Sequence, residues 1–266
     1  MRIAIVSDVH ANLAALEAVL RHAEGQGARD GLWCLGDTVG YGPEPGECIA
    51  RLRGLGATLV AGNHDRAATG KIGTEEFNPD AATAARWTAR QLDGDERQYL
   101  DSLPEVVRLT AGRDRSLKAA PPEGSLQEGE FTLVHGTLRW PIWEYLYSYE
   151  VAQGHLQRQQ TPFGLVGHTH VPMLVLEGEE FPNGCEMYFL EDGTKSKLER
   201  RRKLVLNPGG VGQPRDGDPR ASYAVYDSDE ETVTIHRVEY DIAATQKLME
   251  AAALPRWLID RLSVGR

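Results

Sequence analysis

The sequence contains little cysteine, no long apolar run and no excess of positive charge. The three cysteines, Cys34, Cys48 and Cys185, are odd in number and widely spaced, which argues against a disulfide framework and against a cysteine-type zinc site. No apolar stretch approaches the ~20 residues that span a bilayer, and the first residues lack the pattern of a cleavable signal. We therefore expect a cytoplasmic protein that does not associate with a membrane.

The charge balance limits the partners of the chain. The formal net charge is −10, so the protein as a whole repels polyanions, and a nucleic-acid polymer is a disfavoured partner. The one run of basic residues, at 200–203, fits a solvated turn before a strand better than it fits a phosphate-binding patch.

Apolar runs that alternate with helical patterns predict an α/β fold. The runs at 3–6, 32–35 and 57–61 have the composition of buried strands, and helical patterns follow Asn12 and cover 44–53. This alternation predicts a sheet with parallel members. Further helices are expected from Asn78 onward and at 96–103, 150–160 and 242–262, the last broken at Pro255, and further strands at 105–110, 131–134, 163–166, 171–176, 203–206, 223–226 and 232–238.

The chain shows no sign of division into several domains. Its 266 residues are 41% hydrophobic, which suffices for one sizeable core. We find neither a low-complexity linker nor an internal repeat, so residues 1–266 are predicted to form a single domain. The charged segment at 178–202, which also contains Gly and Pro, predicts an excursion such as an extended hairpin.

Five short motifs place metal-binding side chains at the ends of predicted strands. Side chains at positions i and i+2 of extended backbone point the same way, so both members of an Asp-x-His or His-x-His pair can reach one ion. Glycines beside the motifs permit close approach and positive φ, and sites in open α/β sheets form at the carboxyl ends of strands. The motifs are Asp8-Val9-His10, Gly36-Asp37, Gly62-Asn63-His64-Asp65, His135-Gly136 and Gly167-His168-Thr169-His170.

The order of these motifs resembles that of the calcineurin-like metallophosphoesterase superfamily. All five are intact between residues 8 and 170, and the segments 36–43 and 207–215 are similar to its bacterial single-domain phosphodiesterase and phosphatase branch. Many relatives carry Ser where Gly210 stands, a departure that touches no ligand. The resemblance implies a four-layer sandwich, in which two mixed β-sheets are flanked by helices.

The resemblance also implies a role for each motif residue. Asp8, His10 and His170 would hold one metal ion, and Asn63, His135 and His168 would hold the other. Asp37 would bridge both ions. His64 would face the substrate and stabilise or protonate the leaving oxygen. Asp65 would orient His64, although a simple loop-capping role is the alternative.

The charges of this ligand set favour phosphate chemistry. Two carboxylates stand among seven ligands, so two divalent ions (about +4) and a bridging hydroxide (about −1) leave a net charge near +1. The hydroxide can attack phosphorus in line. The mixed His, Asp and Asn donors suit manganese first, with iron, zinc, nickel or cobalt as alternatives. We therefore predict a dinuclear metal-dependent phosphoesterase, a phosphodiesterase or phosphatase acting on a small phosphorylated substrate.

Several alternatives stay open at this point. Among enzymes they are a dinucleoside-polyphosphate hydrolase and a phosphoprotein phosphatase. In another class, a non-catalytic metal-binding protein-interaction scaffold would be expected to have lost ligands, and none is missing. An aromatic cluster shortly after His135 fits either a packing or homodimer surface or a wall at the mouth of the site on which a nucleobase stacks. Its members are Trp140, Trp143, Tyr145, Tyr147 and Tyr149.

Overall fold

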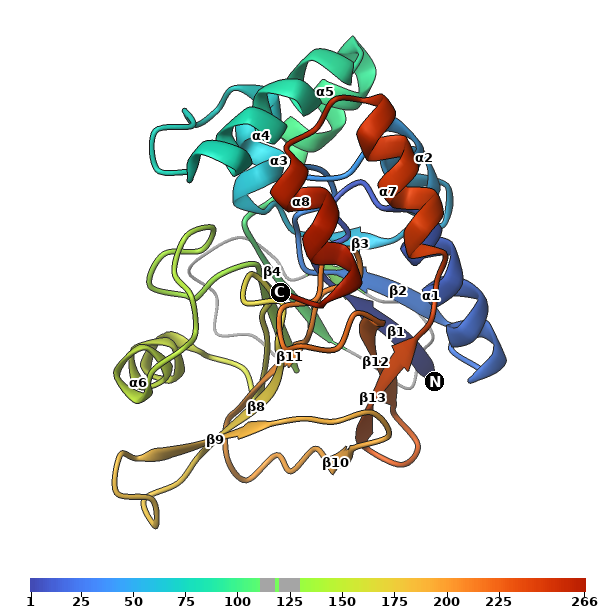
Figure 1. Cartoon of the computed structure of the whole chain (residues 1–266). Helices are drawn as coiled ribbons and strands as arrows, with labels where there is room; N and C mark the ends of the chain where they lie inside the picture. The colour runs from blue at the N-terminus through green and yellow to red at the C-terminus, as the bar shows by residue number, and fades with distance from the viewer. Residues whose placement is uncertain (111–117, 120–129) are drawn as a thin grey trace.

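Two mixed β-sheets lie between helical layers in the computed structural model, which describes residues 1–110, 118–119 and 130–266 (Figure 1). The first sheet has the strand order β10 (Lys195–Lys197), β13 (Thr232–Val238), β12 (Ala221–Asp227), β1 (Arg2–Val6), β2 (Gly31–Cys34) and β3 (Thr58–Leu59). The second has the order β5 (Lys118–Ala119), β4 (Val106–Thr110), β6 (Phe131–Val134), β7 (Phe163–Leu165), β11 (Leu204–Pro208), β8 (Pro172–Glu177) and β9 (Cys185–Phe189).

The parallel strands of each sheet are adjacent. β1, β2 and β3 run parallel in the first sheet, and β6, β7 and β11 run parallel in the second, whereas the remaining pairs are antiparallel. Parallel strands present their carboxyl ends at the same edge. The loops that follow these six strands are therefore available to build one site.

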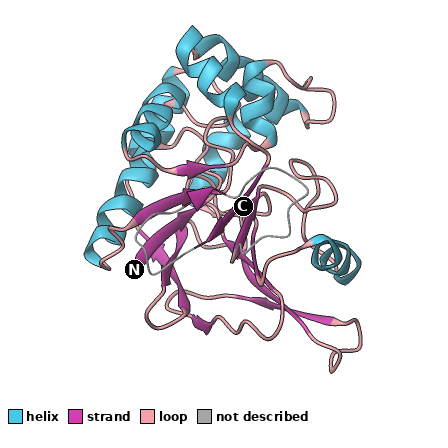
Figure 2. Ribbon diagram, turned by 180° about the vertical axis from the view of Figure 1, so that it is seen from behind, coloured by secondary structure: helices cyan, strands magenta, loops and turns pink. Residues whose placement is uncertain are grey.

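The helices are distributed unevenly over the two sheets (Figure 2). The outer face of the first sheet packs against α1 (Leu13–Gly25), α2 (Pro45–Gly54) and α5 (Gly94–Ser102). Beside them lie α3 (Asn63–Thr69), α4 (Pro79–Gln91), α7 (Ile242–Ala251), α8 (Arg256–Asp260) and the short η1 (Arg261–Ser263). On the outer face of the second sheet, α6 (Tyr149–Arg158) stands apart from the other helices. This arrangement confirms the expected four-layer sandwich.

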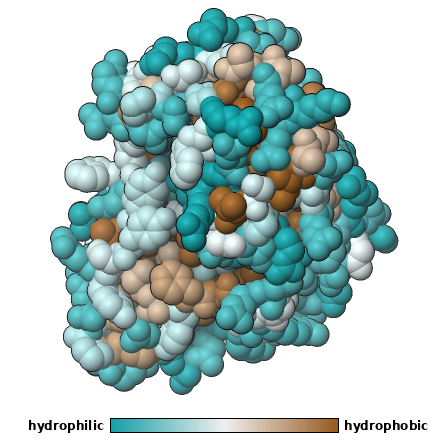
Figure 3. Space-filling view, in the orientation of Figure 1, coloured by the Kyte–Doolittle hydropathy of each residue, from teal (hydrophilic) through white to brown (hydrophobic). Residues whose placement is uncertain are grey.

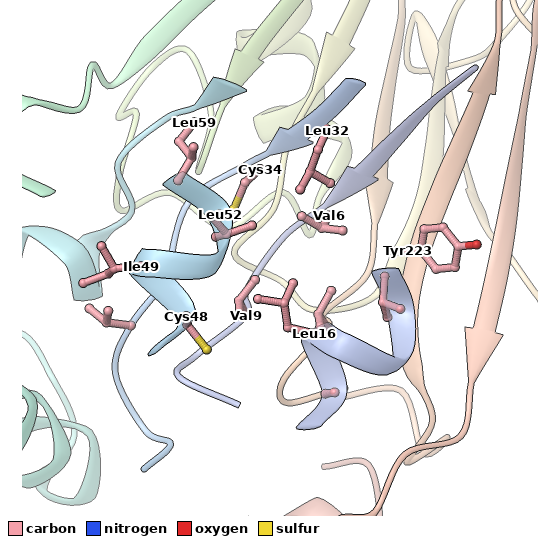
Figure 4. Packing of buried hydrophobic residues seen from close by; sticks show 14 of the residues in the cluster. Val6, Val9, Leu16, Leu32, Cys34, Cys48, Ile49, Leu52, Leu59 and Tyr223 are labelled. Carbon is pink, nitrogen blue, oxygen red and sulfur yellow. The ribbon is translucent and has the colours of Figure 1, made fainter. Parts of the chain in front are cut away.

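Alternation along the strands divides the core into layers. Ala4 and Val6 of β1 face the cluster formed with α1 and α2, where Leu16 and Leu52 pack onto the sheet (Figure 4). Ile3 and Ile5 point the other way, into the apolar layer between the two sheets. Full burial of such side chains contributes roughly 1.5–3 kcal/mol each, so the stacked sheets provide a rigid base for the loops at their edge.

Most predicted elements lie where they were expected, and two regions differ. Pro255 separates α7 from α8, as predicted. The helix α3 and the short strand β5 were not predicted. Within 178–202, β9 pairs antiparallel with the preceding strand β8 as a hairpin, and the chain then crosses to the first sheet, where β10 pairs with β13. That residues 1–266 form a single domain remains a prediction. No helix in the part of the chain that is described has the length and apolarity needed to cross a membrane.

Candidate metal centre

The loops after the parallel strands bring the predicted metal ligands together, and every one of these side chains is buried. Three loops come from the first sheet and two from the second, so the site lies where the two sheets meet at their carboxyl ends. Asp8 and His10 follow β1, Asp37 follows β2, Asn63 follows β3 as the first residue of α3, His135 follows β6, and His168 and His170 lie between β7 and β8.

One group of ligand atoms consists of Asp8, His10 and His170, which lie within 4.8 Å of one another. His170 Nε2 is 3.2 Å from Asp8 Oδ1, and the same nitrogen is 3.2 Å from His10 Nε2. Three donors so close together form one face of a coordination sphere. These are the residues predicted to hold the first metal ion.

A second group consists of Asp37, His135 and His168. His135 Nε2 lies 3.3 Å from Asp37 Oδ2 and 3.0 Å from His168 Nδ1. Asp37 Oδ2 is also 3.7 Å from His10 Nε2. The same carboxylate oxygen therefore lies between both groups, which is the position required of a bridging ligand.

Asn63 and His64 are the first two residues of α3, the helix that begins beside Asp37. Asn63 Oδ1 and His64 Nδ1 are buried and have no hydrogen-bond partner among the described residues. The backbone N–H of His64 donates to Asp37 Oδ1 at 2.9 Å. A ring nitrogen of His64 lies within 4.8 Å of the ligand atoms of His10 and Asp37, so distance alone does not separate a ligand from a substrate-facing ring, and its role stays a prediction.

Backbone carbonyls fix the tautomers of the four histidines His10, His135, His168 and His170. A carbonyl only accepts, so the ring nitrogen that faces it carries the proton, and the other nitrogen points a lone pair into the site. Lone pairs and carboxylate oxygens that face each other at about 3 Å repel unless cations lie among them. The donor set therefore fits bound metal ions. The pairs are His10 Nδ1 with Val39 O at 3.1 Å, His135 Nδ1 with Leu35 O at 2.8 Å, His168 Nε2 with Trp143 O at 3.1 Å and His170 Nδ1 with Gln213 O at 2.5 Å.

The ionisation of the site reflects its burial and crowding. Burial lowers the pKa of His10, His168 and His170 well below the usual range, which keeps these rings in the neutral form that binds metals. Burial and the charge of Asp37 raise the pKa of Asp8 to about 6. Against the effect of burial, the charge of Asp37 raises the pKa of His135 to about 9, so a metal ion that binds this ring would displace a proton from it.

The ligand pairs do not sit on extended backbone, so that part of the sequence argument was wrong. Five ligands have left-handed φ angles: Asp8 (54°), His10 (49°), Asp37 (53°), His168 (66°) and His170 (59°). Each such residue costs of order 1–3 kcal/mol and persists only where its surroundings impose it. The two histidines of the His-x-His pair accordingly point into different groups.

Glycines act at two points next to the centre. Gly36 has a φ of +92°, and a Cβ at this position would lie 2.9 Å from His135 Nδ1. Gly62 has an ordinary φ, but a Cβ there would collide with the carboxylate of Asp37. Both positions therefore require glycine for the ligands to approach.

Asp65 does not have the geometry expected of a residue that orients His64. Its carboxylate accepts the backbone N–H of Gly62 at 2.9 Å and that of Val39 at 3.2 Å, and no hydrogen bond joins it to the His64 ring in the described part of the chain. Asp65 is the third residue of α3, and its bond to the N–H of Gly62 is the half of a capping box that remains when the N-cap residue is a glycine. The capping alternative fits this geometry, because the carboxylate satisfies N–H groups at the helix start.

Sequence reasoning missed Arg215, which lies in the 207–215 segment. Its Nη2 lies 3.0 Å from Gln213 Oε1 and 3.4 Å from Tyr41 Oη, and its Nε atom is buried with no hydrogen-bond partner among the residues that the structure describes. Among the described residues no carboxylate lies within ion-pair distance of it, because neighbouring Asp216 pairs with Arg237. After burial, the charge of Arg215 is the largest cause that lowers the pKa of His170. A half-buried cation, which has no carboxylate within ion-pair distance among the described residues, thus stands beside the centre.

The aromatic cluster reaches the centre directly. The ring of Tyr145 stacks on His168 with a centroid distance of 3.8 Å, and the carbonyl of Trp143 holds the same histidine. Phe77, another residue that sequence reasoning missed, packs edge to face on both His64 (4.9 Å) and Trp143 (5.2 Å). The loop between β6 and α6 therefore forms one wall at the mouth of the site.

Comparison with known proteins gives matches over the whole chain. Residues 1–231 match the calcineurin-like phosphoesterase superfamily domain. An uncharacterized protein of Methanocaldococcus jannaschii is 36% identical over 99% of this chain and 98% of its own length. The solved metallophosphoesterase of Sphaerobacter thermophilus is 44% identical, with a TM-score of 0.83 over 100% of both chains.

One further similarity is local. A stretch of 63 residues is 43% identical to the symmetrical bis(5'-nucleosyl)-tetraphosphatase of Psychromonas ingrahamii. It covers 23% of this chain and 23% of that enzyme. The full-length matches therefore carry the assignment of family and fold.

Proposed function

The chain belongs to the calcineurin-like phosphoesterase superfamily and is a metallophosphoesterase, and we propose that it hydrolyses esters of small phosphorylated molecules at a dinuclear metal centre. The single observation that carries this proposal is the position of Asp37 Oδ2, which lies 3.3 Å from His135 Nε2 and 3.7 Å from His10 Nε2. One carboxylate oxygen shared by two donor groups supports two ions, not one. A non-catalytic scaffold would not need this shared oxygen.

Each ion would have its own ligands beside the shared Asp37. Asp8, His10 and His170 would hold the first ion, and Asn63, His135 and His168 the second. When bound, two such ions lower the pKa of water and withdraw charge from a phosphoryl group. Manganese is the proposed metal, with iron, zinc, nickel and cobalt as alternatives that the same donors accept.

Residues of the chain that are not ligands would bind and orient the substrate. Arg215 would donate to a phosphoryl oxygen, since its guanidinium has no carboxylate partner among the described residues and a phosphate would supply the missing anion. The buried ring of His64, whose Nδ1 has no hydrogen-bond partner in the described part of the chain, would hydrogen-bond the oxygen of the leaving group. Tyr41 packs on His64 with a centroid distance of 4.3 Å and holds that ring in place.

The centre accommodates more than one kind of phosphate ester. A simple phosphodiester or monoester needs only the two ions, Arg215 and His64. Hydrolysis of a dinucleoside polyphosphate is the second candidate, and the local 43% identity to a symmetrical bis(5'-nucleosyl)-tetraphosphatase favours it.

A metal and substrate panel tests the proposal. The purified protein would be stripped with a chelator, reloaded with manganese, zinc or magnesium, and assayed with bis-p-nitrophenyl phosphate and p-nitrophenyl phosphate. We expect turnover that returns with about two equivalents of manganese and is lost in Asp37→Asn, whereas the exposed control Asp95→Asn keeps it. Turnover that survives the chelator, or that Asp37→Asn retains, would refute a dinuclear centre.

A further inference from the structure

An open pocket lies next to the metal centre, in the wall formed by the loop between β6 and α6. It has a volume of about 630 Å³ and is lined by residues 140–145 together with Glu76. Ligand pockets for small molecules fall within roughly 300–1,000 Å³, so this one has the size for a nucleoside. The surface over this loop, left of centre in Figure 3, shows pale colours of intermediate hydropathy.

We propose that this pocket binds the nucleobase of a nucleotide ester by stacking, so that the substrate class of the proposed phosphoesterase is a nucleotide. This inference rests on the proposed function. The pocket presents Trp140, Trp143 and Tyr145 within six residues of chain, and Trp140 keeps 64% of its surface exposed. Bases stack on aromatic side chains because both have flat π-faces.

Direct ring contacts join the pocket to the reaction centre. Trp143 packs on Phe77, and Phe77 packs on His64, while Tyr145 stacks on His168. Tyr145 thus lines the pocket and contacts a predicted metal ligand, and Trp143 lines the pocket and reaches His64 through the ring of Phe77. A nucleotide with its base over Trp143 or Tyr145 would present its phosphate to the metal centre without crossing open surface.

The charges in the pocket favour a neutral ring that carries N–H donors. Glu144 lies 2.9 Å from Arg139 and accepts from Thr137, so its charge is already paired. Glu76 is exposed at the rim of the same pocket. A carboxylate there repels a second anionic group and accepts hydrogen bonds from the amino group of a base such as adenine or cytosine. A simple alkyl group would gain none of these contacts.

A pair of esters with the same leaving group separates base binding from chemistry. We would compare the p-nitrophenyl ester of adenosine 5'-monophosphate with the p-nitrophenyl ester of methyl phosphate, and measure the ratio of their kcat/KM values. We expect the wild-type protein to favour the adenosine ester, and Trp140→Ala and Trp143→Ala each to reduce this ratio about 10-fold. Trp143→Phe should restore most of it, since a flat ring remains.

Controls keep the outcome decisive. Phe189→Ala removes an aromatic side chain that is 72% exposed on β9, outside the pocket, and should leave the ratio unchanged. Trp140 is exposed, so Trp140→Ala tests the pocket even if Trp143→Ala disturbs His168. An unchanged ratio in Trp140→Ala and Trp143→Ala would overturn the inference. Equal losses of kcat/KM for both esters, together with a change from dimer to monomer, would also overturn it, because they would indicate a packing surface.

The failure of this inference can be told apart from failure of the proposed function. If the metal-loaded wild-type protein hydrolyses neither ester, the proposed function itself is wrong. If it hydrolyses the methyl ester and shows no preference for the adenosine ester, the dinuclear phosphoesterase stands and base binding is refuted.

Discussion

The metal centre and the aromatic loop at 136–148 adjoin each other but are built in opposite ways. The centre collects one or two buried side chains from each of five loops, and backbone carbonyls fix its histidines. The aromatic loop is one continuous segment whose rings remain largely exposed, as in Trp140 and Tyr147. A change in this segment can alter the pocket without removing a ligand, so the fold allows substrate choice to vary while the chemistry stays constant.

The two regions meet at the His168–His170 segment, where Tyr147 Oη donates to Thr169 O at 3.0 Å. His168 is a predicted metal ligand, yet the carbonyl of Trp143 orients it and the ring of Tyr145 stacks on it. A substitution in the aromatic loop can therefore also disturb a metal ligand, if it moves His168. The predictions below use variants in both regions, from the largest expected effect to the smallest.

Loss of the bridging carboxylate should have the largest effect. Asp37→Asn removes a charge that both donor groups share, so kcat should fall at least about 10³-fold for every ester. His135→Ala should have a similar effect. Circular dichroism should show that the fold survives, and His22→Ala, at a histidine far from the centre in the first sheet's helical layer, serves as the matched control. A fall in kcat for only one class of ester would contradict the division of chemistry and selectivity between the metal centre and the aromatic loop.

Loss of the His64 ring should reduce the rate and leave the metals bound. With His64→Ala we expect kcat to fall about 10²-fold for alkyl leaving groups, which need stabilisation of the departing oxygen. The loss should be smaller for p-nitrophenolate, which leaves without help. Metal content, measured by mass spectrometry of the metals, separates this role from that of a ligand: a variant that binds one ion fewer would make His64 a ligand.

A conservative change at Arg215 should weaken phosphate binding without regard to the base. Arg215→Lys keeps the charge but loses the planar set of donors, so kcat/KM should fall about 10-fold for the adenosine and methyl esters alike. Arg29→Lys, at an exposed surface position, is the control. Unequal losses of kcat/KM for the two esters would show that Arg215 contributes to substrate selectivity.

Acidification should destabilise the protein through His155, a residue of α6 that contacts the aromatic loop. Its Nδ1 accepts the backbone N–H of Leu138, and burial lowers its pKa to about 4. The unfolded chain, with a pKa near 6.5 at this residue, binds the proton first, so the free energy of unfolding falls as the pH drops from about 6.5 to 4. His155 should account for up to about 3 kcal/mol of this loss.

The difference between two proteins isolates that contribution. Urea unfolding of the wild type and of His155→Gln would be measured at several pH values. The wild type should lose stability more steeply below pH 6.5, because only it carries this titrating ring. If the free energy of unfolding depended on pH in the same way in both proteins, the titration of His155 would not contribute to the stability of the fold.

The sequence predicted the location of the centre better than its local geometry. Strand ends are visible because apolar runs stop at a polar ligand, as at Asp8 and Asp37, and parallel strands must share an edge. The backbone at these ligands was not predictable from spacing, since left-handed angles at His10 or His170 are imposed by tertiary contacts. Asp65 illustrates the same limit, because a carboxylate near a histidine in sequence bonded to backbone N–H groups instead.

Residues that act through distant contacts were the hardest to predict. Arg215 lies 207 residues after Asp8 in the chain and gave no spacing pattern, although it stands beside the same centre. Phe77 comes from the segment before α4, and only the folded chain places it between His64 and Trp143. The carbonyls that orient the histidines belong to residues of any type, so sequence carries no signal for them.

A crystal structure of the manganese-loaded protein, with anomalous diffraction to locate the metal, tests the central claim most directly. We expect two anomalous peaks roughly 3.5–4 Å apart, one beside Asp8, His10 and His170, the other beside Asn63, His135 and His168, with Asp37 coordinating both. A single peak, or two ions without a shared Asp37 carboxylate, would contradict the account.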